Sequence, residues 1–107
     1  MARTFSALSD PTRLHVVEKL MRQGELPVAD LVSDAGMSAP AMSRHLKVLR
    51  EAGVVTQRAE GTKRYYRVAP SALQSISDWT VEHARFWEAS LDRLGAVLAA
   101  EVDGKNE

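Results

Sequence analysis

The sequence contains no cysteine, so it can form neither a disulfide nor a thiolate metal site, and it carries no thiol redox switch. It also has no stretch that approaches the roughly 20 apolar residues of a membrane span. Its first residues, MARTFSALSD, lack the long apolar run of a signal peptide. We therefore expect a cytoplasmic protein that does not enter the membrane.

Glycine and proline are also scarce, with 6 and 4 in 107 residues, while 45% of the residues are apolar. This composition is typical of a globular chain and excludes an extensively disordered one. The length suits one domain, which we expect to span residues 1–100 with a flexible tail over residues 101–107. A core of this size buries only about two thirds of the unfolded surface, so a partner subunit would add stability.

Net charge is absent as well, because 14 Lys and Arg balance 14 Asp and Glu, but the charges are unevenly distributed. Residues 38–67 hold seven cations and two anions, a net charge of +5. Residues 1–37 have a net charge of −1 and residues 68–107 one of −4. A polyanion would therefore be attracted to the middle third of the chain and repelled by the last third.

Three short helices are predicted in the first half of the chain. The first begins at Asp10-Pro11 and ends at Gly24, and the second runs from near Pro27 to Gly36. The third begins after Ser38, a good N-cap, and ends at Gly53. Helix, tight glycine turn and helix are the layout of a helix-turn-helix unit, whose second helix enters a DNA major groove.

The third helix has one apolar face and one cationic face. If Met42, Leu46 and Leu49 point inward, helical geometry places Pro40, Arg44, Lys47 and Glu51 on the opposite face, with Ser43 at its edge. Taken alone, such a face is more often simply solvated. Two strand-like runs follow, Val54–Ala59 and Lys63–Val68, joined by a turn at Gly61. A hairpin presenting Arg58, Lys63 and Arg64 beside that helix favours a cationic surface for duplex DNA.

The last third of the chain predicts one long amphipathic helix over residues 70–100. Its apolar face is too wide for a small domain to bury, so we expect this helix to pack against the same helix of a second copy. A short helix over residues 1–9 would join it. The predicted dimer interface comprises Phe5, Leu8, Trp79, Phe86, Trp87, Leu91 and Leu94.

This order of elements, with the phrases ALSDPTRL, ELPVADL, MSAPAMSRHLKVLREAGVV and GTKRYYRV, resembles the ArsR/SmtB-type family of winged helix-turn-helix transcriptional repressors. The resemblance covers residues 5–98. It implies a mostly helical fold with a small β-hairpin wing (α+β) and a homodimer that binds a double-stranded operator with two half-sites. It assigns to the recognition helix Ser38, Ala39, Pro40, Ala41, Ser43, Arg44, His45 and Lys47, and to the wing Arg58, Gly61, Thr62, Lys63, Arg64 and Tyr65. Relatives often carry Gln where this chain has Ala39, so a polar base contact is lost or replaced by one to a thymine methyl.

The resemblance also bears on metals. Metal-sensing members have two cysteines where this chain has Pro27 and Ala29, and a second common site needs His where it has Thr80. We therefore expect no metal and no cofactor. The open alternatives are a site that uses His83 with Glu82 or Glu88, or a small-molecule pocket lined by Trp79, Phe86 and Trp87.

Two other classes of function compete with a DNA-binding repressor. The first is a winged-helix module that binds a protein and uses its cations only for solubility. The second is an enzyme, which needs a convergent acid, base or nucleophile. Ser43 and His45 cannot form a catalytic dyad, because two residues apart on a helix their side chains point about 200° from each other. His45 is either packed against the fold or in contact with DNA. We expect no catalytic residues, and no inducer is identified.

Overall fold

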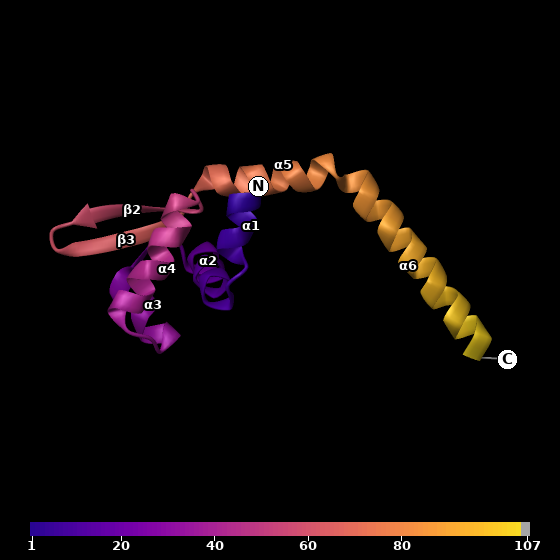
Figure 1. Cartoon of the computed structure of the whole chain (residues 1–107), viewed down its shortest axis with the longest axis horizontal. Helices are drawn as coiled ribbons and strands as arrows, with labels where there is room; N and C mark the ends of the chain where they lie inside the picture. Colours follow the sequence, from indigo (N-terminus) through magenta and orange to yellow (C-terminus); the bar gives the residue numbers. More distant parts are fainter. Residues whose placement is uncertain (106–107) are drawn as a thin grey trace. The chain divides into compact units, whose positions relative to one another are not determined.

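The computed structural model describes the backbone of residues 1–105 and the side chains of residues 1–101. The elements, labelled in Figure 1, are α1 (Ala2–Leu8), α2 (Pro11–Gln23), β1 (Leu26–Pro27), α3 (Val28–Ala35), α4 (Ala39–Glu51), β2 (Val55–Glu60), β3 (Lys63–Val68), α5 (Pro70–Glu82) and α6 (Ala84–Lys105). They form two compact units, Met1–Ile76 and Ser77–Glu107. The expectation of one domain with a tail stays a prediction, and its final residues, 106–107, lie outside the described part.

The predicted boundaries of the first helices are confirmed, because local caps determine them. The Asp10 carboxylate accepts hydrogen bonds from the backbone N–H groups of Thr12 and Arg13, at 2.9 and 3.1 Å. The Ser38 hydroxyl accepts one from Ala41 N–H at 3.2 Å at the start of α4. Gly36 ends α3 with φ 64°, a conformation that glycine adopts without the steric cost of a side chain.

The sheet has one strand more than the sequence pattern predicts. Its order is β1-β3-β2, and both pairings are antiparallel. Strand β1 is only two residues long, and pairs Leu26 with Tyr66 and Pro27 with Tyr65. Two residues are too few to show an alternating pattern, so this strand exists because of the pairing with β3. It attaches the hairpin to the segment between α2 and α3.

The core of the first unit lies between helices α2–α4 and one face of the sheet. The largest fully buried side chains are Leu31, Met42, Leu46, Leu49, Val54 and Val55. The predicted inward face of α4 is therefore confirmed, since its three apolar residues are among them. Removing their side chains from water is the main source of stability for this unit.

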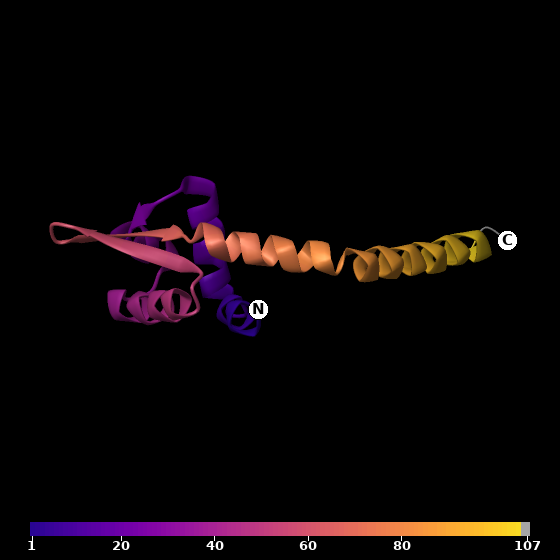
Figure 2. The ribbon, with the colours of Figure 1, turned by 90° about the horizontal axis from the view of Figure 1, so that it is seen from above.

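The hairpin formed by β2 and β3 extends beyond α3 and α4, and Figures 1 and 2 show its closed end projecting past both helices. The two strands pair from Val55 with Val68 to Glu60 with Lys63. The loop between them consists of two residues and begins with Gly61 at φ 61°, as the predicted glycine turn requires. The residues at the tip are therefore exposed on both faces.

The segment after Pro70 differs from the single long helix that the sequence pattern predicts. It forms two helices, α5 and α6, interrupted at His83. The Nδ1 atom of His83 lies 2.7 Å from the backbone oxygen of Trp79, while the backbone N–H of His83 donates to that same oxygen at 3.2 Å. Side chains that compete for a helical carbonyl in this way weaken the regular hydrogen-bond ladder. No helix among residues 1–105 has both the length and the apolar character to cross a membrane.

Candidate nucleic-acid interface

The outer face of α4 is polar and cationic along its first three turns. Ser43, Arg44 and Lys47 are exposed, whereas Met42 and Leu46, which flank them in sequence, have exposed fractions of 0 and 1%. Ser38, Ala39 and Pro40 are exposed at the start of the helix, and Ala41 is half-buried. The helix therefore presents a short polar N-terminal end and two projecting cations. Lys47 is 3.9 Å from Glu51 and both side chains are exposed, so this ion pair is weak.

His45 is a half-buried residue on the edge of that face. Its Nδ1 atom lies 3.5 Å from Nη1 of Arg13, which belongs to α2. A guanidinium has only donors, so in this contact Arg13 is the donor and the ring nitrogen of His45 the acceptor. Arg13 also donates from Nε to the backbone oxygen of Ala7 at 2.7 Å. The packed alternative for His45 thus has a geometric basis, with the Arg13 side chain as its partner.

The register of the hairpin divides the predicted wing residues between two faces. Residues paired directly across antiparallel strands lie on the same face, and neighbours along a strand lie on opposite faces. Arg64, paired with Ala59, lies on the face that carries the buried Val55 and Tyr66. Lys63, Tyr65 and Arg58 lie on the other face. The register therefore places Arg64 on a different face of the hairpin from Arg58 and Lys63, and the cationic surface expected of the three stays a prediction.

Arg58 differs from the tip cations because carboxylates already surround it. Its Nε and Nη2 atoms lie 2.8 and 2.7 Å from one oxygen of Glu25, and its Nη1 lies 3.0 Å from Glu60. Its guanidinium also stacks 4.5 Å from the centre of the Tyr65 ring. The hydrogen bond from Arg58 lowers the pKa of Glu25 below its usual value, and the two carboxylates raise the pKa of Arg58.

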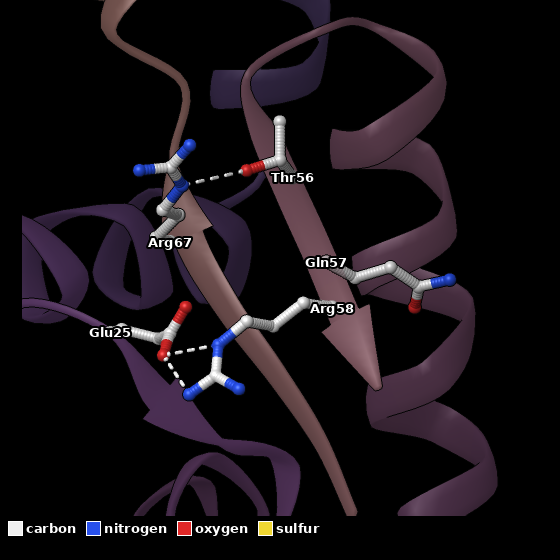
Figure 3. Close-up of a pocket in the computed structure, with 5 residues that line it drawn as sticks. All are labelled: Glu25, Thr56, Gln57, Arg58 and Arg67. Atoms are coloured by element: carbon white, nitrogen blue, oxygen red, sulfur yellow. Dashed lines mark hydrogen bonds and ion pairs between the residues drawn. The ribbon is translucent and has the colours of Figure 1, made fainter. Parts of the chain in front are cut away.

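Figure 3 shows Glu25 and Arg58 pointing toward each other. They line a hollow of about 440 Å³ together with Thr56, Gln57 and Arg67. Arg67 donates from Nε to the Thr56 hydroxyl at 3.3 Å. The hollow lies on the outer side of the sheet, on the face that carries Arg58.

The predicted dimer residues are divided between the two units. Phe5 and Leu8 belong to α1 in the first unit, and the other members belong to α5 and α6 in the second. Trp87 packs edge-on against Phe86 with ring centres 5.2 Å apart, and its ring centre is 6.2 Å from that of Trp79. Along α6 the apolar side chains remain largely exposed in the single chain: Phe86 59%, Trp87 43%, Leu91 65%, Leu94 54%, Val97 56% and Leu98 52%.

The residues considered for a metal site do not converge in the described part of the chain. Among the described residues, no group of three or more His, Asp or Glu side chains is arranged to hold a metal ion. The ring of His83 instead contacts the backbone of Trp79. The expected absence of metal and cofactor stays a prediction.

Three residues that matter to the geometry escaped prediction because their partners are distant in sequence. Glu25 pairs with Arg58, which follows 33 residues later. Lys19 is buried with an exposed fraction of 6%, forms an ion pair with Asp34 and donates to the backbone oxygen of Asp30 at 3.2 Å. Arg13 links α1, α2 and α4. No local spacing indicates these pairs. The one local feature that could have indicated a buried ion pair is the position of Lys19 within the apolar stripe of α2.

A helix-turn-helix with an exposed cationic second helix, followed by a projecting hairpin, defines a winged helix-turn-helix DNA-binding domain. The family model described as "Bacterial regulatory protein, arsR family" matches residues 10–57. The chain is 38% identical over 94% of its length to the HTH-type transcriptional regulator Rv2034 of Mycobacterium tuberculosis, of which it covers 91%. It is 44% identical over 88% of its length to the arsenical resistance operon repressor of Escherichia coli, of which it covers 78%.

Among solved structures, the chain is similar to the homodimeric winged helix-turn-helix DNA-binding domain Mb0332 of Mycobacterium bovis. Its TM-score is 0.61 and its identity 34%, over 77% of this chain and 82% of that one. The chain belongs to the arsR family of bacterial regulatory proteins, and it is a member without cysteine. It is a transcriptional regulator with a winged helix-turn-helix DNA-binding domain. These relatives are regulators, not enzymes.

Proposed function

We propose that the chain acts as a homodimeric repressor that binds an operator with two half-sites, one for each α4. The observation that carries the proposal is the division of α4 into a buried apolar face and an exposed cationic face. The relatives support it, since one is an operon repressor and another a homodimeric DNA-binding domain. In a dimer with two-fold symmetry, two such helices match two half-sites of a palindrome.

In this proposal, Arg44 reads a base and the other cations bind the backbone. Arg44 projects from the second turn of α4, where a guanidinium can donate two hydrogen bonds to O6 and N7 of a guanine. Ser43 contacts a base edge or a phosphate. Lys47 and the wing-tip cations Lys63 and Arg64 bind phosphates, which position the protein without reading sequence.

A binding-site selection with the purified chain tests the base-reading role. Random duplexes are enriched on the protein, and the resulting operator is titrated by fluorescence anisotropy beside a scrambled duplex. Arg44→Ala should weaken operator binding by roughly 1 to 3 kcal/mol and relax preference at one base position. The matched control is Arg50→Ala, because Arg50 is an exposed cation of α4 about 240° round the helix from Arg44. Unchanged base preference in Arg44→Ala would refute the assignment.

The exposed apolar side chains of α6 support the homodimer. Six large apolar residues between Phe86 and Leu98 would otherwise form a patch that monomeric proteins rarely expose. Sedimentation velocity of the wild-type chain should give the dimer mass at micromolar concentration. Trp87→Ala should shift the distribution toward monomer and weaken operator binding, whereas Glu88→Ala, the exposed neighbour, should leave both unchanged. A monomeric wild type that binds a single half-site would overturn this part.

A further inference from the structure

Backbone pairing with β1 joins the hairpin to the rest of the first unit as far as the fourth of its six residue pairs, counted from the base. Strand β1 pairs with Tyr66 and Tyr65 of β3, and Tyr65 lies opposite Arg58 of β2. The pairs Ala59 with Arg64 and Glu60 with Lys63 come after this level, and the loop follows them. The tip that carries the two predicted phosphate-binding cations therefore extends past the β1 pairing by two residue pairs and the loop, and Thr62, Lys63 and Arg64 line a hollow there with residues 27–30.

At the level of the last backbone pair with β1, Arg58 makes the one side-chain ion pair among the described residues that joins the hairpin to a residue outside it. Glu25 lies outside the hairpin, immediately before β1, and its carboxylate oxygen receives both Nε and Nη2 of Arg58. Glu60, by contrast, is on the same strand as Arg58 and two residues away. The contact with Glu60 lies within β2, whereas the contact with Glu25 connects β2 to the segment that leads into α3.

We propose that Glu25 and Arg58 form a latch that fixes the angle of the wing relative to the helix-turn-helix, so that both act as positioning residues for operator recognition. Rotation at the level of Arg58 would move Lys63 and Arg64 together, because both lie beyond the last backbone pair with β1. A displacement of the tip changes which phosphates it reaches while α4 remains in the groove. Selectivity for the operator then depends on a contact that does not touch DNA.

The competing interpretation is that Glu25 only screens the charge of Arg58. Removing it would then release a cation to bind phosphate and strengthen binding to every duplex. The two interpretations predict opposite results for one variant. Glu60→Gln is the matched control. It also removes one negative charge beside the Arg58 guanidinium, but it leaves the contact between the hairpin and Glu25 in place.

The inference rests on the proposed function, and the experiment keeps the two apart. The wild type, Glu25→Gln, Glu60→Gln, Arg58→Gln and the double variant Glu25→Gln with Arg58→Gln are titrated against the selected operator and a scrambled duplex. Hydrogen exchange of the amides of residues 59–64 is measured without DNA. Thermal midpoints are recorded as a check, and they should stay close to wild type, because an exposed ion pair contributes little to global stability.

Glu25→Gln should lower the ratio of operator to scrambled affinity by about twofold to thirtyfold, if each of two latches contributes what an exposed ion pair typically does. Its wing-tip amides should exchange faster, and Glu60→Gln should match wild type in both measurements. The double variant should lower this ratio no further than the more severe of its two single variants, because each single substitution already removes the whole contact. Equal effects of Glu25→Gln and Glu60→Gln, or stronger binding of Glu25→Gln to both duplexes, would overturn the latch. If the wild type binds no duplex selectively, the proposed function fails, and the exchange data alone decide whether the latch exists.

Discussion

Replacing Arg58 and Lys63 one at a time by glutamine tests whether these two wing cations, which the sequence alone assigns the same role, both bind phosphate. Each phosphate that a cation neutralises releases counterions, so log affinity falls with log salt by about 0.9 for every such contact on B-form DNA. Of the five cations of α4 and the wing that are predicted to contact DNA, four per subunit are exposed and not held between two carboxylates: Arg44, Lys47, Lys63 and Arg64. Arg58 is excluded because Glu25 and Glu60 already neutralise it.

For a dimer, this count predicts a slope near −7, an upper bound in magnitude because Arg44 is expected to bind a base. Including Arg58 would bring the slope to about −9. Lys63→Gln should flatten the slope by about 1.8, since two contacts are lost per dimer, and Arg58→Gln should leave it nearly unchanged. Affinity for a scrambled duplex, measured by anisotropy between about 50 and 200 mM salt, gives these slopes without any contribution from base reading.

The decisive comparison is between the slopes of the two variants, not between their affinities. Arg58→Gln can lower operator affinity by detaching the wing and still leave the number of released ions the same. If Arg58→Gln and Lys63→Gln flatten the slope equally, Arg58 leaves Glu25 and Glu60 when DNA binds and contacts a phosphate instead. The assignment of Arg58 to the fold rather than to DNA would then be wrong.

Three further predictions concern stability. Leu46→Ala should cost about 3 kcal/mol in urea unfolding, because its side chain is 1% exposed in the core; a cost below about 1 kcal/mol would contradict this packing. Asp34→Ala should destabilise the fold by roughly 2 kcal/mol, because it leaves the buried ammonium of Lys19 without its partner. Lys19→Met should cost less, because the Asp34 side chain that it leaves unpaired is 55% exposed and can be hydrated. Folding lowers the pKa of Asp10, chiefly through a hydrogen bond from the Arg13 backbone, and that of Glu25, chiefly through one from the Arg58 side chain. These carboxylates therefore stabilise the fold above their ordinary pKa values of 3.8 and 4.5, and this stabilisation is lost as the pH falls through their lowered pKa values. Thermal unfolding between neutral and acidic pH should show this loss, and a variant combining Asp10→Asn and Glu25→Gln should show a smaller one.

The boundaries of the helices were predictable because they depend on residues within one turn of each other. Asp10 and Ser38 cap the free amides at the start of their own helices, and Gly36 supplies a conformation that ends α3. The buried row of α4 follows from spacing along a single helix. The position of the hairpin was also local, since two strand-like runs flank Gly61. All of this information lies within a few residues along the chain.

The sequence by itself thus determined the recognition helix, the wing and the family to which the chain belongs. Only the tertiary structure decided which cations remain available to DNA. Adjacent side chains in a strand must point to opposite faces, but the register with β2 decides that Arg64 shares the face of the core and Lys63 does not. The partner of Arg58 follows from β1, a strand too short to leave a pattern. A contact between residues 33 positions apart has no periodicity, so it exists only once the chain has folded back on itself.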